Sequence, residues 1–194
     1  MNYFTVSMDI IINGGQHYWN KEAKKTSIGF QKPIHEKFMG DGALYIWTYK
    51  PEDEKEFHKK MIFFINQLWN FRVYFDNFIK NCSDDIPVID LPRNIRFGMA
   101  SGSVYKLPYK SSRDEEDIGY CINLASRLQS YSRDLGFIAS ARINLAKDKL
   151  DNNLYHKVIA KSLKGLPEEI VIVDKESYEE LDEQIKSDLF KEIE

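Results

Sequence analysis

The chain has 194 residues, 43% of them hydrophobic, which is enough for one globular domain with a core of its own. Its net charge is −3, which argues against a basic face that follows nucleic acid. Two cysteines, Cys82 and Cys121, give no disulfide framework, and no apolar run approaches the roughly 20 residues that span a bilayer. We therefore expect a cytoplasmic protein that binds neither nucleic acid nor membrane.

The first half of the chain predicts a strand, a hairpin and a long helix. Residues 3–12 are apolar and β-branched around a single carboxylate, as in a central strand. Apolar segments 34–39 and 43–49 flank Gly40-Asp41-Gly42, which is typical of a tight hairpin. An amphipathic helix is predicted from Pro51 to about Cys82, with proline and acids in its first turn.

The second half alternates strands and helices. The predicted strands are residues 95–105, 137–140, 155–160 and 170–174, with a polar loop at 106–114 and a turn at 164–167. The predicted helices are residues 122–133, 141–150 and 176–194. This order favours an α+β fold, a ferredoxin-like βαββαβ sandwich over residues 1–175, followed by a charged C-terminal helix over 176–194.

Two aspartates stand out in this pattern. Asp9 interrupts an apolar strand, and a buried carboxylate without a partner is costly, so such residues are usually paired or bind metal. Asp41 lies at a hairpin tip, where aspartate is also ordinary turn chemistry. In a ferredoxin-like sheet the first strand neighbours the hairpin, which brings both carboxylates to one end of the sheet. Such oxygen ligands suit Mg²⁺ or Mn²⁺ bound together with substrate phosphates.

Short motifs that cover nearly the whole chain follow in one order. They are Ser7-Met8-Asp9-Ile10, Lys37-Phe38-Met39-Gly40-Asp41-Gly42, Ile95-Arg96-Phe97-Gly98-Met99-Ala100-Ser101-Gly102, Gly119-Tyr120-Cys121-Ile122-Asn123-Leu124-Ala125-Ser126-Arg127-Leu128 and Leu163-Lys164-Gly165. In these motifs the chain resembles the class III adenylyl and guanylyl cyclases. The resemblance implies a phosphorus–oxygen lyase that closes a nucleoside triphosphate into a 3′,5′-cyclic monophosphate and releases pyrophosphate.

The resemblance also implies roles for single residues. Asp9 and Asp41, with the backbone carbonyl of Ile10, are expected to bind two divalent cations, Mn²⁺ or Mg²⁺. Asn123 is expected to position the ribose, and Arg127 to meet negative charge at the α-phosphate. These two residues are four apart and share one helix face, although a solvated surface with Arg127 in a salt bridge is the plainer interpretation.

Phosphate and base contacts follow the same resemblance. Lys164 matches a lysine that contacts the terminal phosphates, although it is also ordinary turn chemistry. The family's Gly-Phe-Thr after the first aspartate is replaced here, so backbone amides near Asn13 and Gly14 are the expected phosphate contacts. For the base, Lys37 lies four residues before Asp41, where adenylyl cyclases have a lysine that contacts adenine. The second position, seven residues before the asparagine, falls on Glu116 beside Asp117, in a loop one residue short.

The shortened loop and the Gly40-Asp41-Gly42 strand context resemble the pyrimidine cyclases of bacterial Pycsar antiphage systems. That resemblance implies UTP, then CTP, as substrate, with a separate effector protein that reads the cyclic product. It also implies a head-to-tail homodimer in which one subunit supplies the metal ligands and the other supplies Asn123, Arg127 and Lys164. The alternatives are an adenylate cyclase, a catalytically inactive nucleotide-binding module, and an RNA-binding ferredoxin-like domain.

Overall fold

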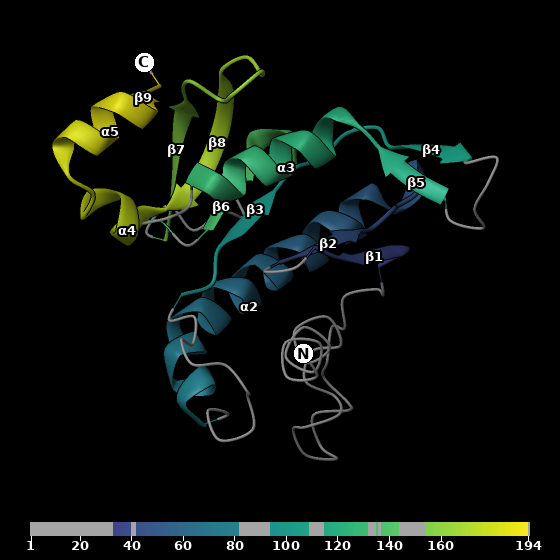
Figure 1. Cartoon of the computed structure of the whole chain (residues 1–194), viewed down its shortest axis with the longest axis horizontal. Helices are drawn as coiled ribbons and strands as arrows, with labels where there is room; N and C mark the ends of the chain where they lie inside the picture. Colours follow the sequence, from purple (N-terminus) through teal and green to yellow (C-terminus); the bar gives the residue numbers. More distant parts are fainter. Residues whose placement is uncertain are drawn as a thin grey trace. The chain divides into compact units, whose positions relative to one another are not determined.

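The computed structural model describes residues 33–39, 42–81, 94–108, 115–131, 135, 137–143 and 154–193. The chain divides into two compact units, residues 1–91 and 92–194. Figure 1 draws both in sequence colours. We describe each unit by itself.

The first unit contains the predicted hairpin. Strands β1 (His35–Phe38) and β2 (Ala43–Ile46) pair antiparallel, and the backbone N–H of Met39 donates to the carbonyl of Gly42 over 2.8 Å. The prediction of a hairpin is confirmed. Its turn residue Asp41 lies outside the described residues, as does the predicted strand over residues 3–12.

A long helix follows the hairpin, as the sequence predicts. A 3₁₀ turn, η2 (Pro51–Asp53), leads into α2 (Glu54–Asn81). Apolar side chains at three- and four-residue spacing form a buried stripe along α2; they are Met61, Phe64, Ile65, Leu68, Phe75 and Ile79. The Phe64 ring meets Trp47 edge to face with 5.2 Å between ring centroids. Phe64 and Phe75 of α2 therefore serve as core, and the contact of Phe64 with Trp47 anchors the segment after β2.

The second unit is built on a five-stranded sheet in the order β3-β6-β8-β7-β9. Its strands are β3 (Phe97–Met99), β6 (Phe137–Ser140), β7 (Tyr155–Ala160), β8 (Glu169–Asp174) and β9 (Phe190–Glu192). Strands β3 and β6 are parallel, and the other neighbours are antiparallel. The predicted strands 137–140, 155–160 and 170–174 are confirmed.

Helix α3 (Tyr120–Tyr131) contacts β3 and β6, as Figure 1 shows. Its inner side chains Leu124 and Leu128 are fully buried in the core of this unit. The remaining core residues come from the sheet, from the segments that precede or connect its strands, and from the end of the chain; they are Leu135, Ile138, Val158, Ala160, Leu163, Val171, Val173, Tyr178, Leu181 and Phe190. The helix predicted over 122–133 is confirmed as far as Tyr131 and begins two residues earlier, at Tyr120.

Residues 95–105 differ from the single strand expected there. Pairing with β6 ends at Met99, and the chain then forms β4 (Tyr105–Pro108), which pairs antiparallel with β5 (Glu115–Ile118) as a separate two-stranded sheet. Part of the loop expected at 106–114 is therefore strand. The helix expected over 141–150 begins as a 3₁₀ turn, η4 (Ala141–Ile143), and its remainder lies outside the described residues.

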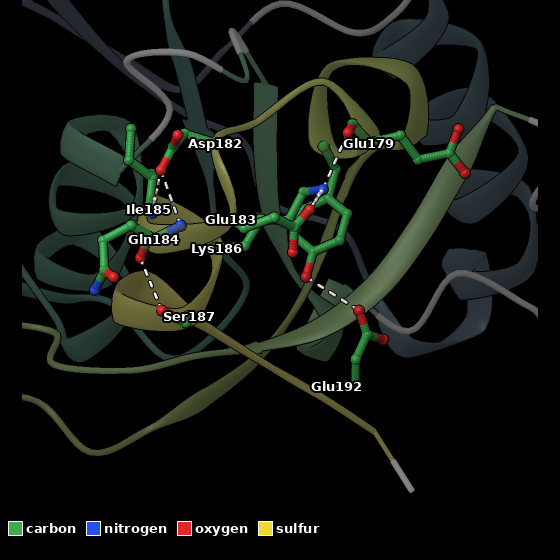
Figure 2. Close-up of polar contacts among 9 residues, drawn as sticks. Glu179, Asp182, Glu183, Gln184, Ile185, Lys186, Ser187 and Glu192 are labelled. Carbon is green, nitrogen blue, oxygen red and sulfur yellow. Dashed lines mark hydrogen bonds and ion pairs between the residues drawn. The ribbon is translucent and has the colours of Figure 1, made fainter.

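The end of the chain also differs from the single charged helix expected over 176–194. It forms α4 (Lys175–Glu179), α5 (Glu183–Leu189) and β9. Asp182 interrupts the helix because its side chain accepts hydrogen bonds from the backbone N–H groups of Gln184 (2.8 Å) and Ile185 (3.4 Å), which caps α5 (Figure 2). The buried Leu181 and Phe190 turn the segment back onto the core.

The structure is thus of mixed α and β type, with helices against a largely antiparallel sheet. The ferredoxin-like strand order requires residues 3–12, so it stays a prediction, as does the homodimer. In the described ranges, no helix combines the length and the apolar character needed to cross a membrane.

Candidate functional site

Close backbone contacts fix the position of α3. A Cβ added at Gly98 on β3 would lie 2.2 Å from the carbonyl oxygen of Ala125 and 2.4 Å from the backbone nitrogen of Gln129. A Cβ at Gly119 would lie 2.5 Å from the carbonyl oxygen of Ser103. Only glycine allows this approach, so the small residues of the 95–102 and 119–128 motifs hold α3 against β3.

The outer face of α3 carries the two residues expected to be catalytic. Asn123 and Arg127 are exposed, whereas Cys121, Leu124 and Leu128 are buried on the inner face. Within the described parts of the chain, no hydrogen bond or ion pair engages the side chain of either Asn123 or Arg127. The surface salt bridge considered for Arg127 is therefore not observed there. The Arg127 side chain is exposed on this face.

The acids expected to read the base lead directly into this helix. In the β4–β5 hairpin, Glu116 lies opposite Leu107 and is exposed, and Asp117 lies opposite Lys106 and is half-buried. Strand β5 then passes through Gly119 into α3. The carbonyl of Gly119 accepts hydrogen bonds from the backbone N–H groups of Ile122 (3.2 Å) and Asn123 (3.4 Å). Glu116 and Asp117 are therefore connected to the N-terminal end of α3 by a short, hydrogen-bonded link.

Lys164 lies in the tight turn between β7 and β8. The backbone N–H of Leu166 donates to the carbonyl of Leu163 over 2.8 Å, and Gly165 has a φ of 77°, the left-handed conformation that favours glycine at this place in a turn. Lys164 is exposed, while the preceding Leu163 is buried in the same core as the inner face of α3. The turn therefore presents the lysine to solvent.

The other predicted site residues belong to the first unit, and most of them lie outside the described residues. Lys37 is exposed on β1 and belongs to the first unit. Asp9, Ile10, Asn13, Gly14 and Asp41 lie outside the described residues, so the predicted metal and phosphate contacts are untested. Within the described ranges, no group of three or more histidine, cysteine, aspartate or glutamate side chains is arranged to hold a metal ion.

A buried polar network near the start of α3 was not predicted from the sequence. The Glu169 carboxylate, only 4% exposed, accepts hydrogen bonds from Ser140 Oγ (2.6 Å) and Arg142 Nε (2.8 Å). The Arg142 guanidinium lies over the ring of Tyr120, the first residue of α3, with 5.5 Å from Cζ to the ring centroid. The hydrogen bond and the charge of Glu169 raise the pKa of Arg142, so this guanidinium stays charged.

The cysteine of α3 is not suited to covalent chemistry. Burial raises the pKa of the Cys121 thiol, and its Sγ lies 3.7 Å from the carbonyl oxygen of Ser103. Because the thiolate is the reactive form, a buried thiol with a raised pKa is a poor nucleophile.

No protein-family model matches the chain, and no curated protein matches it. Two solved structures described as a bacterial light-regulated adenylyl cyclase match the chain, each with 16% sequence identity, and the TM-scores are 0.47 and 0.49. The match covers 96% of this chain and 47% of each of those chains, so this chain spans about half their length. At this degree of similarity, function has to be argued from the chain's own residues.

Proposed function

We propose that the chain is a class III nucleotide cyclase, which forms a 3′,5′-cyclic nucleotide and pyrophosphate from a nucleoside triphosphate. The observation that carries the proposal is the outer face of α3, where Asn123 and Arg127 are exposed one turn apart. The glycine contacts that hold this helix on β3 belong to the same motifs that resemble the family. The resemblance and the local structure therefore agree on the same surface.

In the proposed reaction, the 3′-oxygen of the ribose attacks the α-phosphorus and loses its proton. The bond from the α-phosphorus to the oxygen that bridges the α- and β-phosphates breaks, and pyrophosphate leaves. The Asn123 amide is suited to hold the ribose by hydrogen bonds, and the Arg127 guanidinium to stabilise charge on the α-phosphate oxygens. Catalysis by these groups consists of positioning and charge stabilisation.

Lys164 adds a further cation for the terminal phosphates in this proposal. Its exposed position in the β7–β8 turn leaves the ammonium accessible to a ligand. Divalent cations at Asp9, Ile10 and Asp41 would supply charge neutralisation and a more acidic 3′-hydroxyl. The amides near Asn13 and Gly14 would contact the phosphates, as the resemblance implies.

Removal of the Arg127 guanidinium is the first test. We expect Arg127→Ala to lower the rate of cyclic nucleotide formation by about a hundredfold or more, as loss of a charge-stabilising donor does elsewhere. Ser130→Ala is the matched control, because Ser130 is exposed on α3 and its hydroxyl donates to the carbonyl of Ser126 in its own helix (3.2 Å). Equal rates for Arg127→Ala and Ser130→Ala would remove Arg127 from the reaction.

The proposed active assembly is a head-to-tail homodimer. If one subunit supplies Asp9 and the other supplies Arg127, each alanine variant alone is inactive, whereas a mixture forms heterodimers with one intact site. We expect the mixture of Asp9→Ala and Arg127→Ala to recover up to about a quarter of wild-type activity, because random pairing makes half the dimers mixed. Heterodimers that form, by mass spectrometry, without activity would refute the shared site.

We assign UTP, then CTP, as the favoured substrate, and an antiphage signal as its product. The support is the sequence of the β5 segment. The tryptophan that the family commonly has before the glycine is missing before Gly119, so the loop is one residue short. The pair of residues that contacts a purine, Lys37 and the position seven residues before Asn123, is therefore incomplete. Lys37 favours the alternative of ATP, because it occupies the lysine position of adenylate cyclases. A rise of cUMP or cCMP in infected cells, lost in the Arg127→Ala strain, is the expected cellular result.

A further inference from the structure

Arg142 is held on two sides next to the proposed site. Its Nε donates to Glu169 Oε1 over 2.8 Å, and its backbone N–H donates to Ser140 Oγ over 3.1 Å. Ser140 Oγ in turn donates to the same Glu169 oxygen over 2.6 Å. The guanidinium carbon lies 5.5 Å from the ring centroid of Tyr120. A buried carboxylate and an aromatic face therefore fix the guanidinium in one orientation.

Most of this guanidinium nevertheless faces solvent. The Arg142 side chain is 58% exposed, whereas that of Glu169 is 4% exposed. Within the described ranges, Glu169 is the sole hydrogen-bonding partner of the Arg142 side chain, and it engages Nε only. Among the described residues, none accepts a hydrogen bond from the two terminal nitrogens, which leaves their N–H groups as the donors that a ligand would meet. Fixing the fork in advance lowers the entropy lost when a ligand binds.

Arg142 lies beside Tyr120 at the N-terminal end of α3, and this position indicates which part of a nucleotide it meets. Tyr120, Asn123 and Arg127 follow at spacings of three and four residues, so they lie along one face of the helix. Under the proposed function, Arg127 meets the α-phosphate and Asn123 meets the ribose. The base then extends past Asn123 toward the N-terminal end of α3, where Tyr120 and Arg142 lie.

We infer that Arg142 is a substrate-contacting residue that recognises carbonyl oxygens of the base, with Tyr120 as its stacking platform and Glu169 as a positioning residue. This inference rests on the proposed function. A guanidinium only donates hydrogen bonds, so it favours bases with carbonyl acceptors. Uracil has carbonyls at C2 and C4, cytosine has one at C2 and guanine has one at C6, whereas adenine accepts hydrogen bonds only at ring nitrogens. We therefore expect Arg142 to favour UTP over ATP.

The test measures binding separately from turnover. Because the 3′-hydroxyl is the attacking group, 3′-deoxy-UTP and 3′-deoxy-ATP bind without reacting, and calorimetry with Mn²⁺ gives a dissociation constant for each. In Arg142→Gln, we expect affinity for 3′-deoxy-UTP to fall about tenfold relative to 3′-deoxy-ATP, the value of one good hydrogen bond. Lys191→Gln is the matched control, since Lys191 is exposed on β9 and the variant also removes one positive charge.

Two more variants separate recognition from folding. Arg142→Lys keeps the charge but loses the planar fork, and we expect the same loss of uridine preference with wild-type circular dichroism. Glu169→Gln keeps the shape of the side chain and weakens the hold on Arg142, and we expect a smaller loss of that preference. An unchanged ratio of the two affinities in folded Arg142→Gln or Arg142→Lys would overturn the inference.

Activity assays on the same wild-type protein distinguish a wrong role for Arg142 from a wrong proposed function. A wild-type protein that forms cyclic nucleotide, with an affinity ratio that Arg142→Gln does not change, refutes only the role of Arg142. A wild-type protein that forms no cyclic product from any ribonucleoside triphosphate refutes the cyclase proposal, and the assignment of Arg142 falls with it.

Discussion

The substitution Gly98→Ala tests how α3 is held on the sheet. The added Cβ would lie 2.2 Å from the carbonyl oxygen of Ala125, and 2.4 Å and 2.8 Å from the backbone nitrogen and Cα of Gln129. Because ordinary contact begins near 3.4 Å, the helix must move away by about 1 Å. All three atoms belong to the helix backbone, so no side-chain rotation relieves the clash. We expect a loss of about 3 kcal/mol in unfolding free energy, the upper end for overpacking.

Urea unfolding followed by far-ultraviolet circular dichroism measures this loss. The matched control is Gly42→Ala, because nothing lies within 4 Å of a Cβ added there and Gly42 does not need a positive φ. We expect the control to stay within about 0.5 kcal/mol of wild type. Movement of α3 by about 1 Å should also lower cyclase turnover by about a hundredfold. A Gly98→Ala protein as stable as the control would refute the close contact of α3 with β3.

Further predictions concern the core and the end of the chain. Tyr178→Phe should reduce the loss of stability between pH 10 and 12. Burial and the hydrogen bond to Glu192 (3.1 Å, Figure 2) raise the pKa of Tyr178 from 10.0 to about 12, so the phenol stays protonated in the folded state while the unfolded state ionises first. Urea unfolding of both proteins at several pH values checks this, and parallel curves would contradict it. Asp182→Ala should cost about 1 kcal/mol by removing the cap of α5, measured as a lower urea midpoint, whereas Asp188→Ala on the exposed side of α5 should cost less. Leu128→Ala should cost about 3 kcal/mol because the side chain is fully buried in the core, and a change under about 1 kcal/mol would place Leu128 outside it.

The hairpin, α2 and α3 were predictable because their signals are local. Gly40-Asp41-Gly42 between two apolar runs fixes where the chain turns, and the hydrogen bond from Met39 to Gly42 closes it there. The apolar spacing of α3 predicts both its inner face and the outward position of Asn123 and Arg127. The periodicity of apolar residues therefore predicts the position of the candidate site residues on this helix.

The end of the chain shows what local patterns miss. A run of charged residues at helical spacing predicts one helix, but Leu181 and Phe190 are buried in the core of the second unit. Their burial bends the segment, and Asp182 supplies a new cap at the bend. Burial against the core stabilises the bent form, and a single sequence does not show which residues will meet the core.

The polar network of Arg142 and Glu169 was missed for a related reason. Glu169 stands beside Glu168 after a proline, which is typical of a solvated turn, yet Glu168 is exposed and Glu169 is buried. The burial follows from the pairing of β8 with β6 and β7, which brings Ser140 and Arg142 to the carboxylate. Only long-range strand pairing identifies this partner, because Glu169 lies 27 residues from Arg142.

The central claim is nucleotide cyclisation, and product analysis tests it most directly. Purified protein is incubated with Mn²⁺ and each of ATP, GTP, CTP and UTP in turn, and the products are identified by mass spectrometry. We predict a 3′,5′-cyclic monophosphate with an equal amount of pyrophosphate, fastest from UTP and then CTP, and lost in Arg127→Ala. Cyclic AMP as the sole product would contradict the pyrimidine assignment, and the absence of any cyclic product would contradict the cyclase itself.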